Sequence, residues 1–200
     1  IKYAFNEDRD GKSTPASVGH RRFQNNPDIT SVELGDGIKL VGDLTFNLCK
    51  QLKTVKLNEQ LQEIGTAAFA HSGVETINLP ESLKLIGNEA FQECKSLERI
   101  EIPGSVTSIG DGAFYGCTGL KTLIINRPPK GQLTIGSLAF AQCKSLNSIE
   151  FKGGGTSTIE LFNDTFEDCC PQKPQKTGLF SGVFSKTETE TETETEVINL

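Results

Sequence analysis

Apolar side chains recur along this chain with a period of about 23 residues. Seven phenylalanines stand 23, 23, 22, 23, 26 and 26 residues apart, and alanine directly precedes four of them. A glycine that follows valine or isoleucine stands four residues before six of them. The phenylalanines are Phe23, Phe46, Phe69, Phe91, Phe114, Phe140 and Phe166. A pattern that returns at this period indicates that successive turns of the chain stack on one another.

Each repeat also contains an alternating pair of apolar residues, of which Ile100 and Ile102 are typical. Alternation is the period of a β-strand, and one repeat is too short to bury its own apolar face. The pattern therefore predicts a β-rich solenoid with one short parallel strand per turn of about 23 residues. Short helical or irregular segments are expected around each Ala-Phe pair. The glycine before that pair marks a tight bend, where a side chain would clash or φ must be unusual.

A row of cysteines lies three residues after the phenylalanines. Its members are Cys49, Cys94, Cys117, Cys143 and Cys169. Ser72 and Asn26 take the same place in other turns, which indicates a slot that selects for size. Buried free thiols are expected, because free cysteine behaves as a small apolar residue. A disulfide or a metal site is the alternative, and Cys170, which lies outside the row, has no assigned state.

The segment from Leu97 to Cys117 reads L-x-x-I-x-I-P-x-S-V-x-x-I-G-x-x-A-F-x-x-C. This string resembles the BspA-like class of leucine-rich repeats, and the resemblance covers roughly residues 17–170. It implies a solenoid used for recognition, without catalytic activity, in surface and host-contact proteins of bacteria and in protist families. A place at the cell surface or outside the cell is therefore favoured. The departures are a shortened turn at AHSGV (residues 70–74) and two turns of 26 residues.

The outward face of the strands is the first candidate binding surface, because solenoids present such faces to their partners. Its residues are Thr76, Asn78, Arg99, Glu101, Thr122, Ile124, Ser148 and Glu150. Ile124 is expected to be an exposed apolar residue among polar ones, beside Arg99, a residue type enriched at binding hot spots. The alternative is an ordinary solvated sheet.

The two long turns offer a second candidate surface. Their extra residues fall in the loops 126–133 and 151–158, which should lie side by side. These loops would place Arg127, Lys130 and Lys152 on one basic ridge. The alternative is a pair of tolerated surface loops.

The composition narrows the function. The net charge of −6 argues against nucleic acid or an anionic membrane as partner, and no apolar run approaches the ~20 residues that span a bilayer. The two histidines, His20 and His71, lie in no catalytic motif, and no metal or cofactor site is predicted. We therefore expect a non-catalytic module that recognises a protein or glycan, for example in adhesion. The alternative is a structural spacer. The oligomeric state stays open.

The repeat also sets the expected domain boundaries. Residues 1–16 form an N-terminal segment or loop, and residues 17–170 form the solenoid, of about seven turns. A linker (171–186) and a Thr-Glu low-complexity segment (187–196) follow. The last residues, 197–200, repeat an earlier strand sequence, and they begin either a further turn or a closing strand.

Overall fold

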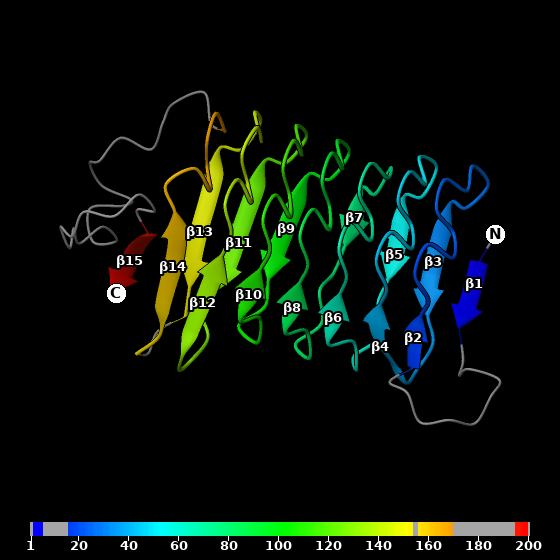
Figure 1. Ribbon diagram of the computed structural model, residues 1–200, viewed down its shortest axis with the longest axis horizontal. Coiled ribbons are helices and arrows are strands. Elements are labelled where there is room, and N and C mark those ends of the chain that lie inside the picture. The colour runs from blue at the N-terminus through cyan, green and yellow to red at the C-terminus, as the bar shows by residue number, and fades with distance from the viewer. Residues whose placement is uncertain (1, 6–15, 154–155, 170–194, 200) are drawn as a thin grey trace.

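The computed structural model describes residues 2–5, 16–153, 156–169 and 195–199. In these parts of the chain the regular secondary structure consists of β-strands alone. The strands form two rows along an elongated stack (Figure 1). The first row holds β1 (Lys2–Phe5), β3 (Ser31–Leu34), β5 (Thr54–Lys56), β7 (Thr76–Ile77), β9 (Arg99–Ile102), β11 (Thr122–Asn126) and β13 (Ser148–Lys152). The second row holds β2 (Ala16–Val18), β4 (Ile38–Val41), β6 (Glu63–Ile64), β8 (Leu85–Ile86), β10 (Ser108–Ile109), β12 (Gln132–Ile135), β14 (Thr158–Phe162) and β15 (Thr195–Asn199).

The predicted solenoid of parallel strands is confirmed, with two differences. Each turn carries two short strands and not one, because the residues before the repeat glycine also pair from turn to turn. The segments around the Ala-Phe pairs are irregular turns, and no helix occurs in the described residues. Three of the four five-residue strands, β11, β13 and β14, belong to the turns with additional residues, so part of each insertion lengthens a strand.

The two rows differ in continuity. The second row forms one sheet of eight strands, from β2 to β15. The first row is divided into a four-stranded sheet that ends at β7 and a three-stranded sheet that begins at β9. The strand ladder on this face is therefore interrupted between β7 and β9.

The phenylalanines form one continuous stack through the centre of the solenoid. Neighbouring rings are parallel within 13°, with centroids 5.0 to 5.5 Å apart. The five inner rings are fully buried, and Phe23 and Phe166 at the two ends are partly exposed. Each turn thus adds one layer to a core that no single turn could enclose.

The repeat glycines are required by close approach of the turns, and not by unusual dihedral angles. A Cβ atom placed on Gly87 would lie 2.7 Å from the backbone carbon of Gly65 and 2.8 Å from the nitrogen of Thr66. None of the six glycines in this slot has a positive φ. Of the two explanations that the sequence left open, the steric one applies.

Other residues do carry the strain of left-handed dihedral angles. Among the described residues, eleven other than glycine have positive φ, and they fall at two recurring places, two residues before and two residues after the phenylalanine. Glu89 has φ of 56°, and Gly112, in the same slot one turn later, has φ of 59°. Only glycine adopts this region without a steric penalty.

Replacing Glu89 with glycine is therefore expected to raise the free energy of unfolding by about 0.5–1 kcal/mol. Relief of the left-handed strain, about 1–2 kcal/mol, exceeds the extra entropy that glycine gains on unfolding. Gly112→Ala is the matched reverse change, since its Cβ would meet nothing closer than 3.6 Å. Urea denaturation of both variants checks this, and a stability change of the same sign in both would contradict it.

The cysteine row is buried, and its five described members are free thiols. The Cys117 thiol donates a hydrogen bond to the carbonyl oxygen of Phe91 at 3.1 Å, and Cys94 does the same to Phe69 at 3.1 Å. The slot therefore selects for a small donor as well as for size. Burial raises the pKa of Cys94 to about 11 and raises the pKa of Cys117 well above its usual value. Cys170 lies outside the described residues.

These buried thiols should make the protein less stable in alkali. They stay protonated in the folded state while the unfolded thiols ionise. Their contribution to the free energy of unfolding is therefore complete below about pH 8.5 and is lost as the pH rises toward 11. The melting temperature should fall over this range, and fall less steeply in a Cys94→Ala variant. Equal slopes for the two proteins would contradict the raised pKa of Cys94.

Additional strands pair at both ends of the stack. β1 pairs in parallel with β3, so the ladder includes residues that the sequence assigned to an N-terminal segment. At the other end β15 pairs antiparallel with β14, which makes the last residues a closing strand and not a further parallel turn. β15 begins at Thr195, inside the Thr-Glu segment. The linker (171–186) and most of the Thr-Glu segment lie outside the described residues.

Candidate functional site

The break in the first strand row coincides with the shortened turn. Val74 follows Phe69 by five residues, whereas Leu97 follows Phe91 by six. Gly73 replaces two residues at this corner and donates its N–H to the carbonyl oxygen of Cys49 at 3.2 Å. A Cβ atom there would clash with the carbonyl oxygen of Lys50. The short turn is thus held against the preceding turn, and β7 pairs with β5 but not with β9.

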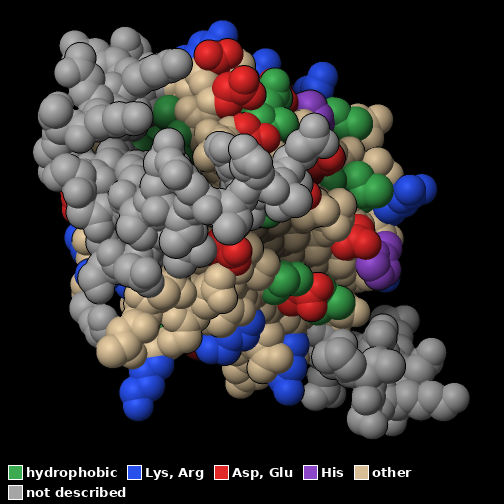
Figure 2. All heavy atoms as spheres, turned by 60° about the vertical axis from the view of Figure 1, so that its left-hand side comes forward, with side chains coloured by type: hydrophobic (Ala, Val, Ile, Leu, Met, Phe, Trp, Pro, Cys, Tyr) green, Lys and Arg blue, Asp and Glu red, His purple; other side chains and the backbone are tan. Residues whose placement is uncertain are grey.

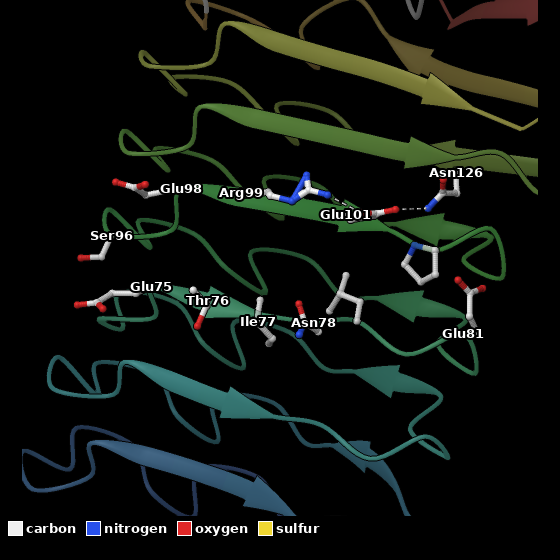
Figure 3. A pocket seen from close by; sticks show the side chains of 12 residues that line it. Glu75, Thr76, Ile77, Asn78, Glu81, Ser96, Glu98, Arg99, Glu101 and Asn126 are labelled. Carbon is white, nitrogen blue, oxygen red and sulfur yellow. Dashed lines mark hydrogen bonds and ion pairs between the residues drawn. The ribbon is translucent and has the colours of Figure 1, made fainter.

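A groove of about 800 Å³ lies over this break (Figure 3). Its walls come from β7, β9, the segments that flank them and the end of β11. The lining residues are Glu75, Thr76, Ile77, Asn78, Leu79, Glu81, Ser96, Glu98, Arg99, Glu101, Pro103 and Asn126. A second hollow of about 350 Å³ lies at the corner of the shortened turn and shares Ser96 with the groove.

Acidic groups dominate the charge of this groove, with four glutamates and one arginine in the lining. Glu75 pairs with Lys53 at 2.9 Å, and Glu98 pairs with Lys121 at 2.8 Å. Both lysines belong to turns outside the break. Within the described residues, the ion pairs of these two glutamates are with Lys53 and Lys121, although the two glutamates occupy the same repeat position in consecutive turns.

Arg99, Glu101 and Asn126 form a connected polar chain across the groove, which Figure 3 shows as dashed contacts. An Nη of Arg99 contacts a carboxylate oxygen of Glu101 at 2.7 Å, and the Asn126 amide donates to the other oxygen at 3.0 Å. The Asn126 hydrogen bond is the main cause that lowers the pKa of Glu101, and the charges of Lys152 and Arg99 add to it. Glu101 is therefore an anion at neutral pH.

The predicted strand-face residues fall into two groups. Thr76, Asn78, Arg99 and Glu101 line the groove. Those on the later strands lie beyond it: Thr122, Ile124, Ser148 and Glu150.

The expected exposure of Ile124 was wrong. Only 3 % of this residue is exposed, although it lies in register with the solvent-facing Glu101 and Glu150. Alternation along a strand predicts the side of the sheet on which a side chain lies, but not how completely that side chain is shielded. Ile124 is thus a packed residue and not an exposed contact.

The structure brings the two long loops together, but two of their three cations, Arg127 and Lys152, make local contacts. The N–H of Arg127 donates to the carbonyl oxygen of Lys152 at 2.9 Å, and its guanidinium donates to Gly153 O at 2.7 Å. Lys152 contacts Glu150 at 3.7 Å, and Lys130 is exposed. On the face shown in Figure 2, acidic and basic side chains are intermixed where described residues are visible.

Sequence reasoning missed five polar residues of the groove: Glu75, Glu81, Ser96, Glu98 and Asn126. A signal for two of them was present. Glu75 and Glu98 take the same repeat position in consecutive turns, and Glu75 comes directly after the corner that lacks a residue. Like charges on directly neighbouring strands are unfavourable, which marks this position as unusual.

The chemistry available here is that of recognition by charge and hydrogen bonding. Among the described residues, no group of three or more His, Cys, Asp or Glu side chains has a geometry that could hold a metal ion. The described part of the chain also contains no helix with the length and apolar character to cross a membrane.

Comparison with protein families identifies the repeat. The model of the BspA type leucine rich repeat region, with 6 copies, matches residues 16–130 and 127–174. The chain belongs to the BspA-type leucine-rich repeat family. The resemblance that the string from Leu97 to Cys117 predicted is thereby confirmed, and this BspA-type protein shares its repeat with solved bacterial structures.

Three solved structures are similar to this BspA-type chain. The leucine-rich repeat protein of T. pallidum is 27% identical, with a TM-score of 0.65 over 76% of this chain and 72% of that one. A leucine-rich cell surface protein of Faecalibacterium prausnitzii is 28% identical (TM-score 0.56), over 62% of this chain and 32% of that one. A leucine-rich repeat protein of Eubacterium ventriosum is 26% identical (TM-score 0.58), over 66% of this chain and 34% of that one.

The chain thus spans about a third of the length of the last two proteins. No curated protein sequence gives a significant match to it.

Proposed function

We propose that this chain is a non-catalytic recognition module that binds a protein partner through the groove between β7 and β9. The groove itself is the observation that carries the proposal. It is the place where the repeat is interrupted on the strand face, and it gathers charged and hydrogen-bonding side chains within about 800 Å³. A spacer would need only a regular stack, whereas this break creates a concave polar surface.

A place at the cell surface is part of the same proposal. The similar protein of F. prausnitzii, 28% identical, is a leucine-rich cell surface protein. Adhesion to another protein would suit a surface module. A glycan partner is the second choice, because the lining contains no aromatic ring on which a sugar could stack.

A capture experiment with the immobilised chain tests the proposal. Surface and secreted proteins of the organism that makes the chain, and of its host, are passed over wild-type protein and over an Arg99→Ala, Glu101→Ala variant. The control is Glu33→Ala, Lys56→Ala, which removes another ion pair (2.8 Å) from the same face outside the groove. We expect a partner that the wild type and the control retain and the groove variant loses.

Other outcomes would point elsewhere. Equal capture by all three proteins would contradict the groove as the binding site and would favour the ridge of Arg127, Lys130 and Lys152. No capture by any of them would contradict recognition and favour the structural spacer.

A further inference from the structure

The charged residues before the strands of the first row form a column that changes sign twice. Its members in consecutive turns are Lys53, Glu75, Glu98 and Lys121. Two glutamates therefore stand next to each other across the break, with a lysine on each outer side. The phenylalanine rings of the same two turns are 5.3 Å apart, which sets the spacing of these turns in the core.

Each glutamate turns to the lysine on its outer side. The contacts are 2.9 Å for Lys53 with Glu75 and 2.8 Å for Lys121 with Glu98, and both pairs are exposed. Figure 3 shows Glu75, Ser96 and Glu98 at one end of the groove, with Glu75 and Glu98 on its two sides. Exposed ion pairs contribute little, so a cation from a partner can share these carboxylates at small cost.

The opposite end of the groove carries a second pair of acids. Glu81 and Glu101 line this end, and Asn126 lies beside Glu101 (Figure 3). Glu81 follows Glu75 by six positions, so at about 3.3 Å per extended residue the two acidic ends are at most roughly 20 Å apart. The hydrogen-bonding groups of Thr76 and Asn78 lie between them.

We propose that the groove between β7 and β9 binds an extended polypeptide segment with a lysine or arginine at each end, one of them between Glu75 and Glu98. This rests on the proposed recognition function and names the chemistry of its partner. The hydroxyl and amide groups between the acidic ends suit the backbone of such a segment. Arg99 is paired with Glu101 at 2.7 Å, and Glu75 and Glu98 are held only by exposed lysine pairs that a cation of the segment can share.

Fluorescence anisotropy with three labelled peptides of the same length tests this. Each is a Ser/Thr peptide of about nine residues, with two positions about six residues apart occupied by lysine, glutamate or glutamine. The full chain is compared with a Glu75→Gln, Glu98→Gln variant. The matched control, Glu33→Gln, Glu150→Gln, changes the net charge equally and removes two acids of the same face outside the groove.

We expect the lysine peptide to bind the wild type and the control equally, and the groove variant about tenfold more weakly. Equal weakening in both variants would show attraction to the overall negative charge and would overturn the proposal. Binding of the glutamate or glutamine peptide in the groove would overturn the proposal that the ligand is a basic segment, but it would remain consistent with a recognition function. Failure of the lysine peptide to bind the wild type would also overturn the segment, while the capture experiment decides the proposed function separately.

Discussion

Replacing Phe114 with alanine is expected to lower the free energy of unfolding by about 3–5 kcal/mol. Phe114 is fully buried and lies between Phe91 and Phe140, with ring centroids 5.1 and 5.0 Å away. Removing the ring opens a cavity that stacked turns on both sides cannot close, because each turn is held by its own neighbours. Chemical denaturation monitored by circular dichroism measures the change.

Phe23→Ala is the matched control for this prediction. Phe23 belongs to the same stack, with the ring of Phe46 at 5.4 Å, but it is partly exposed. Its loss should cost less than half as much, since solvent can fill part of the space. If the two substitutions have the same effect, the layers do not depend on one another as the stack implies.

Replacing Gly87 with alanine should have the second largest effect, a loss of about 3 kcal/mol. Its Cβ would meet the backbone of Gly65 and Thr66 at 2.7 and 2.8 Å, and backbone atoms cannot move aside as a side chain can. Overpacking commonly costs about 1–3 kcal/mol, and this clash lies at the upper end because the turns themselves must separate. Thermal and urea denaturation measure it.

The first turn provides the control for Gly87. Gly19 occupies the same slot, but a Cβ atom there would meet nothing within 4 Å. Gly19→Ala is therefore expected to be neutral or slightly stabilising, because alanine reduces the entropy of the unfolded chain. A comparable loss in both variants would mean that the slot requires glycine for its dihedral angles, contrary to the steric explanation.

Only part of the candidate groove could be predicted from the repeat pattern. Thr76, Asn78, Arg99 and Glu101 were assigned to the outer face by alternation, and the structure places them in one groove. The same alternation failed for Ile124, which is packed. Alternation concerns one strand at a time, and shielding depends on everything that packs around the side chain. The glutamates of the groove were missed because their meaning depends on two turns that fail to pair.

The sequence by itself determined the stacking of this protein. One phenylalanine, one glycine and one small donor per turn require neighbouring copies to complete each layer, so the period alone specifies a parallel solenoid. The tertiary structure decided the second strand of each turn, the steric role of the glycines and the antiparallel closing strand. It also decided that the loss of one residue before Val74 divides the first sheet at β7. A period describes what every turn has in common, whereas a groove arises where two particular turns differ.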